Sequence, residues 1–403
     1  MLVISDEVIQ EVKARTDLAE LIASYGVEVK LCGRAKKACC PFHKEKTPSF
    51  NINVSKGFYH CFGCGESGDA IKFVQKMEGL DFVESVKKLA ERCGVVIVDA
   101  ALDGNGVSPR KRISLDKDAE KMAKALNESD SAAIAREYLK SRDIDDEAVK
   151  SFRLGYGGND GFFAGRIVFP IVDHQGKVCG FSARALDDTA QPKYINSAES
   201  ETFKKGRLLY GADRAFPSVA NDMNRTLIIC EGQFDVIRCH AAGIVNAVAG
   251  LGTALTEEHA ALIKRHADSV VLAYDGDVAG NKAVVRAGNI LVSAGIPVLV
   301  AEMPKDEDPD TVIRYCGAGE FKKLVTGAVS LSSFEARYFM ELAGGERRID
   351  TVSLVAGKVM EAIARCPSAV QQSMMLADLA DSLGIGMAVV EADFRTFASV
   401  PNL

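Results

Sequence analysis

The sequence predicts a multi-domain α/β protein with a metal-binding ribbon at its N-terminus and a helical subdomain at its C-terminus. Two short Cys/His pairs lie in the first hundred residues, and strand-like and helix-like segments alternate from Thr226 onward. The tail from Leu331 is dominated by Ala, Leu, Met and Glu at helical spacing. These patterns are typical of a zinc ribbon, an open and mostly parallel α/β sheet, and a terminal helical subdomain.

The composition is that of an ordinary globular protein, with 47% hydrophobic and 26% charged residues among 403. It excludes a disordered chain, a collagen and a coiled coil. No apolar stretch approaches the roughly 18 residues of a spanning helix, and the N-terminus lacks the order of a signal peptide. We therefore expect a cytoplasmic protein with no membrane partner. The net charge of −6 gives no indication of nucleic-acid binding, so local charge has to decide.

The first domain is expected over residues 1–98, where short amphipathic helices flank a ribbon. The expected caps and stops of these helices are Ser5, Asp17, Asp69 and Asp81, and Gly26, Gly79 and Gly94. Within the ribbon, residues 30–56 carry seven basic residues against one acidic residue, Glu45. Residues 99–112 are rich in Gly, Asp and Pro without periodicity, so we expect a linker there.

Three further parts are expected after the linker. Residues 113–224 contain a pair of strands turned at 174–176 and a basic loop, residues 225–312 form the parallel sheet, and residues 313–403 form the helical subdomain.

The Cys/His pairs predict one structural zinc ion. Cys40 and His43 form a C-x2-H pair, and Cys61 and Cys64 form a C-x2-C pair seventeen residues later. Zinc takes four such ligands, and a full set leaves no open position for catalysis. Cys39 is a spare thiol beside Cys40. The basic residues of the ribbon are interleaved with the aromatic residues Phe50, Phe58, Tyr59 and Phe62, which favours base stacking and a small ribbon core about equally.

Acidic residues follow three of the predicted parallel strands. They are Glu231, the pair Asp275 and Asp277, and the pair Asp308 and Asp310. The carboxyl ends of parallel strands meet at one edge of the sheet, so we expect these side chains to converge. Clustered carboxylates hold either protons or divalent ions, and oxygen ligands favour Mg²⁺ or Mn²⁺. A single acidic pair could equally cap a helix, but three in succession favour metal.

Other motifs give weaker signals. The run GLGTAL from Gly250 carries only part of a dinucleotide fingerprint, so it indicates either an anion-tolerant turn or packing. The basic loop before the sheet contains Arg184, Lys193, Tyr194, Asn196 and Lys205, and composition alone favours phosphate binding and plain surface charge equally.

Together these residues resemble the bacterial DnaG-type DNA primases. The stretch from Cys40 to Phe50 and the stretch from Phe58 to Cys64 are similar to the zinc-binding domain of that family. The segments RIVFPI, PKYINS and FKKGRLLYG look like its polymerase core, and the strand-end acids look like its Toprim metal site. The combination favours primases over topoisomerases, which share the Toprim acids alone.

The resemblance implies synthesis of short RNA primers from ribonucleoside triphosphates on single-stranded DNA, with a replicative helicase as partner at the replication fork. It implies that Glu231 is an acid/base or metal-ordering group and that two or more Mg²⁺ or Mn²⁺ ions are held by Asp275, Asp277, Asp308 and Asp310. The nucleotide- or template-binding positions it implies are Arg184, Lys193, Tyr194, Asn196 and Lys205. The ribbon is expected to help select the initiation sequence.

Two departures from the family pattern stand out. The segment between Tyr156 and Arg166 is short, and no room is evident for a helicase-docking domain. We expect either a piece of a longer chain or a compact phage or mobile-element member. The alternative functions are a non-catalytic single-stranded-DNA-binding or helicase-loading module and a Toprim nuclease or strand-transfer enzyme.

Overall fold

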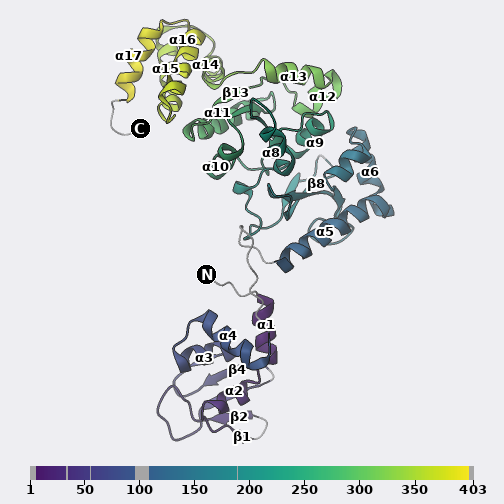
Figure 1. The fold of residues 1–403 in the computed structure, drawn as a ribbon, viewed down its shortest axis with the longest axis vertical. Coiled ribbons are helices and arrows are strands. Elements are labelled where there is room, and N and C mark those ends of the chain that lie inside the picture. The colour runs from purple at the N-terminus through teal and green to yellow at the C-terminus, as the bar shows by residue number, and fades with distance from the viewer. Residues whose placement is uncertain (1–5, 33–34, 55, 96–108, 188, 399–403) are drawn as a thin grey trace. The chain divides into compact units, whose positions relative to one another are not determined.

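The computed structural model describes residues 6–32, 35–54, 56–95, 109–187 and 189–398 (Figure 1). It divides into two compact units, Met1–Pro109 and Arg110–Leu403. Most of the predicted linker lies outside the described residues, and its last residues already belong to helix α5, which begins at Pro109.

The N-terminal unit is an antiparallel sheet with helices on either side of it in sequence. The strands pair in chain order. Asp17, Asp69 and Asp81 cap helices as predicted, whereas Ser5 lies outside the described residues. The elements are α1 (Asp6–Arg15), α2 (Leu18–Ser24), β1 (Lys30–Cys32), β2 (Ala35–Ala38), β3 (Phe50–Asn53), β4 (Phe58–Cys61), β5 (Ser67–Gly68), α3 (Ala70–Glu78) and α4 (Phe82–Cys93).

The aromatic residues of the ribbon divide between its core and its surface. Phe50 and Tyr59 are fully buried and stack at 4.9 Å between ring centroids, so they form the core. Phe58 and Phe62 are 44% and 71% exposed. The interpretation as a ribbon core is therefore confirmed for Phe50 and Tyr59, and base stacking stays a prediction for the exposed Phe58 and Phe62.

The second unit begins with helices and a four-stranded antiparallel sheet in the order β6-β7-β8-β9. Strands β7 and β8 form the predicted hairpin around His174 to Gly176. The elements are α5 (Pro109–Glu128), α6 (Ala133–Ser141), α7 (Asp146–Ser151), β6 (Gly155–Tyr156), β7 (Arg166–Val172), β8 (Val178–Ala185), β9 (Tyr194–Asn196) and α8 (Ala212–Ala220).

The predicted parallel sheet follows, with strands in the order β11-β10-β12-β13-β14. All pairs are parallel except β13 with β14. Chain order reverses around β10, which is where open α/β sheets place a ligand crevice. The elements are β10 (Thr226–Cys230), α9 (Gln233–Ala241), β11 (Ala247–Ala249), α10 (Glu257–His266), β12 (Ser269–Ala273), α11 (Val278–Ser293), β13 (Val298–Val300), α12 (Pro309–Cys316), α13 (Ala318–Thr326) and β14 (Val329–Ser330).

The C-terminal part is helical, as predicted, and packs on the sheet through one continuous apolar core. Its helices are α14 (Leu331–Leu342), α15 (Ile349–Ala364), α16 (Ala369–Leu383) and α17 (Met387–Ala398). Helix α12 packs on α9 of the sheet. The helical subdomain therefore starts with α14, later than the predicted boundary after residue 312, which falls inside α12. Within the described part of the chain, no helix has the length and apolar character needed to cross a lipid bilayer.

Glu335 of α14 is buried in this core at 1% exposure, beside Asn289 of α11. Burial raises the pKa of its carboxyl to about 8 from an ordinary value of 4.5. The folded state therefore keeps a proton that the unfolded state loses, and Glu335 reduces stability as the pH rises from about 4.5 to 8.

We predict that Glu335→Gln removes this pH dependence. Urea denaturation at pH 5 and pH 8 should show that the variant loses less stability than wild type on going to pH 8, by on the order of a few kcal/mol. Glu341→Gln, on the exposed end of the same helix, is the control and should behave like wild type. Equal pH dependence in all three proteins would refute the prediction.

Candidate zinc centre and carboxylate site

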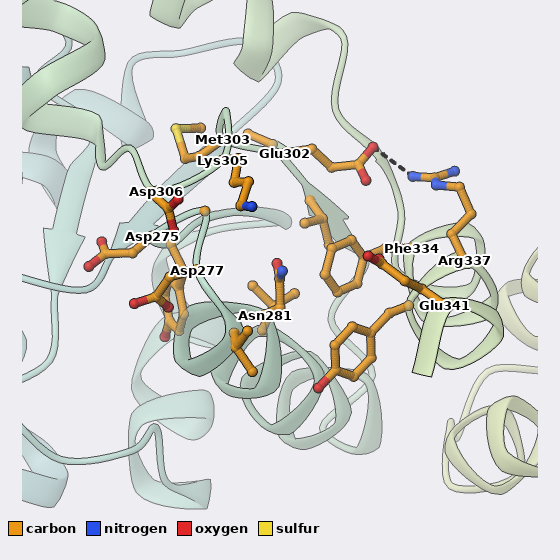
Figure 2. Close-up of a pocket in the computed structure, with 17 residues that line it drawn as sticks. Asp275, Asp277, Asn281, Glu302, Met303, Lys305, Asp306, Phe334, Arg337 and Glu341 are labelled. Atoms are coloured by element: carbon orange, nitrogen blue, oxygen red, sulfur yellow. Dashed lines mark hydrogen bonds and ion pairs between the residues drawn. The ribbon is translucent and has the colours of Figure 1, made fainter. Parts of the chain in front are cut away.

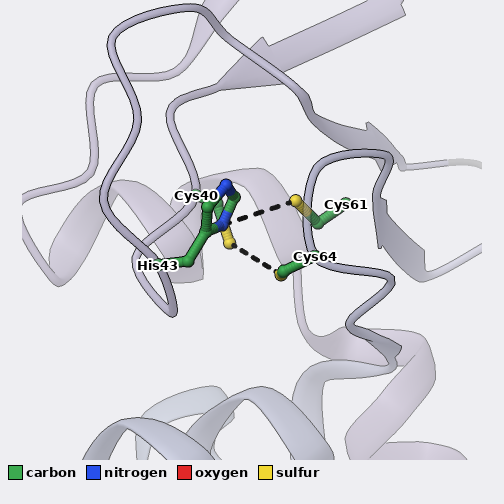
Figure 3. Close-up of side chains that lie close together, drawn as sticks. All are labelled: Cys40, His43, Cys61 and Cys64. Carbon is green, nitrogen blue, oxygen red and sulfur yellow. Dashed lines mark hydrogen bonds between the residues drawn. The ribbon is translucent and has the colours of Figure 1, made fainter.

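The four predicted zinc ligands lie together at the ends of two loops (Figure 3). One ligand atom from each of Cys40, His43, Cys61 and Cys64 lies within 4.8 Å of the others. Cys40 Sγ is 3.8 Å from Cys64 Sγ, and Cys61 Sγ is 3.9 Å from His43 Nδ1. Cys39 is exposed and outside the cluster. Three thiols and one imidazole are a donor set suited to tetrahedral zinc.

Glu45 contacts two parts of this cluster, although the sequence marks it only as the one acid of the basic ribbon and as part of the stretch from Cys40 to Phe50. One carboxylate oxygen lies 3.2 Å from His43 Nε2, so the ring turns Nδ1 toward the thiols. The same carboxylate accepts hydrogen bonds from the Cys40 amide at 2.6 Å and from Ser49 Oγ at 2.6 Å. A carboxylate behind a histidine ligand fixes the ring and raises its basicity. The signal available in the sequence was its position two residues after His43.

The strand-end carboxylates converge as predicted at the C-terminal edge of the parallel sheet. Glu231 directly follows β10, and Asp275 and Asp277 follow β12. Burial and the nearby charges of Glu231, Asp308 and Asp277 raise the pKa of Asp275 to about 7. Partial desolvation and the charge of Asp277 likewise raise the pKa of Glu231. These shifts have the cause expected of several carboxylates that share one small region.

Asp275 also has a carboxylate oxygen without a hydrogen-bond partner in the described part of the chain. Its Oδ1 is buried and accepts no hydrogen bond from any described residue. Asp277 and Asp308, by contrast, cap α11 and α12 by accepting from the amides of Gly280 and Thr311. Among the described residues, no three carboxylates approach one another as closely as the zinc ligands do. A Mg²⁺ site does not require such a tight group, because Mg²⁺ binds through one or two carboxylates and otherwise keeps water or phosphate oxygens.

Asp310 lies in a different environment. It is 3% exposed, and its two oxygens accept from Arg238 Nε at 2.6 Å and from Arg142 Nη1 at 3.2 Å. Its amide donates to Asp235 Oδ1 at 3.3 Å. Sequence reasoning did not select Asp235, although it follows Glu231 by four residues on the first turn of α9. Burial and the charges of Asp308 and Asp275 raise the pKa of Asp235 well above its ordinary value.

Only some side chains of the predicted basic loop lie near the strand-end carboxylates. The positive charge of Lys193 partly offsets the rise in the pKa of Asp275, so Lys193 lies within electrostatic range of that carboxylate. Asn196 Nδ2 donates to the Leu251 carbonyl at 3.4 Å, beside the GLGTAL loop. Arg184 is instead buried against the rings of Tyr138, Tyr194 and Phe234, and it donates to Tyr194 Oη at 3.1 Å. The Lys205 amide contacts Glu199 at 3.1 Å.

A cavity of about 470 Å³ opens beside the carboxylates (Figure 2). Asp275 and Asp277 lie at one end, and the ion pair of Glu302 with Arg337 lies at the other at 2.6 Å. Its charged lining is mainly acidic, with the basic residues Lys305 and Arg337 set against Asp275, Asp277, Glu302, Asp306 and Glu341.

Three families match successive parts of the chain. Residues 4–103 match the CHC2 zinc finger, residues 157–216 match the N-terminal domain of the DNA primase catalytic core, and residues 228–313 match the Toprim-like family. The Cys40, His43, Cys61 and Cys64 cluster is therefore a zinc site, and a Toprim domain implies a divalent metal.

Curated relatives are similar along most of the chain. The DNA primase of Halalkalibacterium halodurans is 33% identical over 98% of this chain and 72% of its own length. The DNA primase of Clostridium acetobutylicum is 38% identical over 83% of this chain, and the match spans 61% of that protein. These relatives give no support to a phage or mobile-element origin.

Solved structures are similar as well. The Aquifex aeolicus primase, comprising zinc-binding and RNA polymerase domains, has a TM-score of 0.59 and 30% identity, covering 95% of this chain and 98% of that one. A DnaG primase catalytic domain bound to single-stranded DNA has a TM-score of 0.60 and 28% identity, covering 70% of this chain and 98% of that one.

We predict that Glu45→Ala weakens zinc binding roughly 10- to 100-fold, because His43 loses the group that orients it. Competition with a chromogenic chelator would measure the affinity. Glu28→Ala, at an exposed acid of the same unit, should leave it unchanged. Wild-type affinity in Glu45→Ala would show that the carboxylate does not support the site.

Proposed function

The chain belongs to the family of DnaG-type DNA primases, and we propose that it is a DNA-directed RNA polymerase that makes short RNA primers from ribonucleoside triphosphates on single-stranded DNA. The observation that carries this proposal is the convergence of Glu231, Asp275 and Asp277 at one edge of the sheet, with an oxygen of Asp275 buried and unpartnered.

The residues proposed to hold two or more Mg²⁺ or Mn²⁺ ions are Glu231, Asp275, Asp277 and Asp308. These residues fit a divalent ion because carboxylate oxygens are its preferred ligands. Burial and the negative charges of the other three raise the pKa of Asp275, and the buried Oδ1 of Asp275 accepts no hydrogen bond from a described residue. Bound there, divalent ions would neutralise the developing charge of phosphoryl transfer and activate a hydroxyl group.

The chain's own side chains supply the remaining roles. The Glu231 carboxylate accepts the proton of the primer 3′-hydroxyl. The oxygen of that hydroxyl bonds to the α-phosphorus of the incoming nucleotide, and pyrophosphate leaves. Lys193, whose charge acts on Asp275, is proposed to bind the incoming triphosphate.

Asp310 is assigned a positioning role. Both of its oxygens already accept from arginine, so it fixes the Asp308 loop and holds Asp235 through its amide. Arg184, Tyr194, Asn196 and Lys205 are proposed to shape the nucleotide- and template-binding wall, with Arg184 acting through Tyr194.

The zinc-binding unit is proposed to contact the single-stranded template through its exposed Phe58 and Phe62 and the surrounding lysines. A replicative helicase at the cytoplasmic replication fork is the further partner that we propose, from membership of the family. A purely DNA-binding or helicase-loading role leaves the strand-end acids unexplained, and a nuclease role leaves the zinc unit and the primase core unexplained.

We predict that Asp277→Asn abolishes primer synthesis. Asparagine caps a helix about as well as aspartate, so α11 stays capped while the ligand charge is lost. The assay is incorporation of labelled ribonucleotides on single-stranded DNA circles with Mg²⁺ or Mn²⁺.

Asp306→Asn is the matched control. Asp306 lines the acidic cavity but has no assigned role, and its φ of 60° is tolerated by asparagine. It should retain wild-type synthesis within about twofold. Synthesis by Asp277→Asn at the wild-type rate would overturn the metal-site assignment, and no synthesis by wild type under either metal would overturn the proposed function.

A further inference from the structure

Helix α11 separates two cavities of opposite charge at the active edge of the sheet. On one side is the acidic cavity described above, which faces α14 and carries five carboxylates. On the other side is a cavity of about 400 Å³ between α11 and the loop of residues 250–255. We call this second cavity the basic slot. Its charged residues are Lys282 and Arg286, with Glu231 as the single acid.

The two cations of the basic slot are available for a ligand. Lys282 and Arg286 are four residues apart on α11, so they lie on one face of the helix. Both are exposed, and neither forms an ion pair or a hydrogen bond with a residue that the structure describes. An anionic ligand is therefore favoured in this slot and repelled from the acidic cavity on the other side of α11.

The shape of the basic slot fits a single nucleotide. Its helix wall is made of Ala279, Ala283 and Ala287 beside the two cations, and its loop wall contains Gly250 and Gly252. Gly252 has a φ of +70°, a left-handed conformation that glycine adopts without strain. Because glycine has no side chain, this wall of the slot is formed by backbone at that position. A volume of about 400 Å³ lies at the small end of ligand sites, which suits one nucleoside and not a duplex.

The position of Glu231 decides which nucleotide this is. Glu231 lines the basic slot, and in the proposed reaction it takes the proton from the 3′-hydroxyl of the growing strand. The incoming triphosphate is proposed to meet Asp275 and Lys193, and neither of these residues lines the slot.

We therefore propose, on the basis of the proposed function, that the basic slot holds the 3′-terminal nucleotide of the RNA primer. Its backbone phosphates lie on Lys282 and Arg286, and its 3′-hydroxyl points to Glu231. This assigns a binding role to the GLGTAL loop, which sequence reasoning left between an anion-tolerant turn and packing.

A binding experiment without Mg²⁺ or Mn²⁺ tests the slot independently of catalysis. The probe is a labelled RNA hexamer annealed to a longer DNA strand, compared with the same DNA alone, by fluorescence anisotropy of the zinc-loaded full chain in a buffer to which no Mg²⁺ or Mn²⁺ is added. The double variant Lys282→Ala/Arg286→Ala should weaken hybrid binding about tenfold. It should also reduce the slope of the logarithm of the binding constant against the logarithm of salt concentration by about two, because two phosphate contacts are lost. Binding to single-stranded DNA alone should stay within about twofold.

An extension assay adds a second readout. The double variant should raise KM for the annealed RNA about tenfold and leave KM for the incoming nucleotide within about twofold. Lys282→Arg/Arg286→Lys, which keeps both charges, should restore most of the affinity. Arg265→Ala, which removes an exposed cation of α10 outside the slot, should match wild type.

The outcomes separate the two proposals. A raised KM for the incoming nucleotide alone, or unchanged hybrid binding, would overturn the slot assignment while leaving primer synthesis intact. Absence of extension by wild type itself would overturn the proposed function, and the anisotropy result would still decide whether the slot binds the hybrid.

Discussion

Electrostatic repulsion among carboxylates at one edge of the parallel sheet is the constraint on which the rest of the second unit depends. Three strands deliver Glu231, Asp275 and Asp308 to the same edge, and each raises the free energy of charging its neighbours. The protein offsets part of this repulsion itself. Arg142 and Arg238 form ion pairs with Asp310, and the positive charge of Lys193 partly offsets the rise in the pKa of Asp275. Asp275 Oδ1 is still left without a partner among the described residues, and this is where we propose that a divalent ion binds.

The surroundings of this edge follow from the same charge distribution. Helix α11 starts at the Asp277 cap and carries cations on the face opposite the acidic cavity. The acids can therefore hold metal while a phosphate backbone is drawn to a different surface. The zinc-binding unit has its own apolar core, beside which thiol and imidazole ligands join two loops and Glu45 orients the imidazole.

Sequence patterns predicted much of this organisation because the signals are local. Caps at Asp17, Asp69 and Asp81, the β7–β8 hairpin and the Cys/His spacing depend on a few neighbouring residues. What sequence reasoning missed depends on tertiary packing. Arg142 reaches Asp310 across 168 positions, and Asp235 is distinctive only because α12 brings Asp308 and Asp310 over it. The sequence likewise did not predict the burial of Arg184 or the start of the helical subdomain at α14. Composition does not reveal which neighbours cover a residue.

The most direct test is thermal unfolding of wild type and Asp275→Asn as a function of Mn²⁺ concentration. Removing one charge relieves repulsion, so the variant should have the higher Tm without added metal. Binding stabilises the folded state by mass action, so Mn²⁺ should raise the Tm of wild type and leave that of the variant nearly unchanged. Zinc binding is common to both proteins and cancels in the comparison. A variant that is less stable without metal and is stabilised by Mn²⁺ as much as wild type would contradict the account.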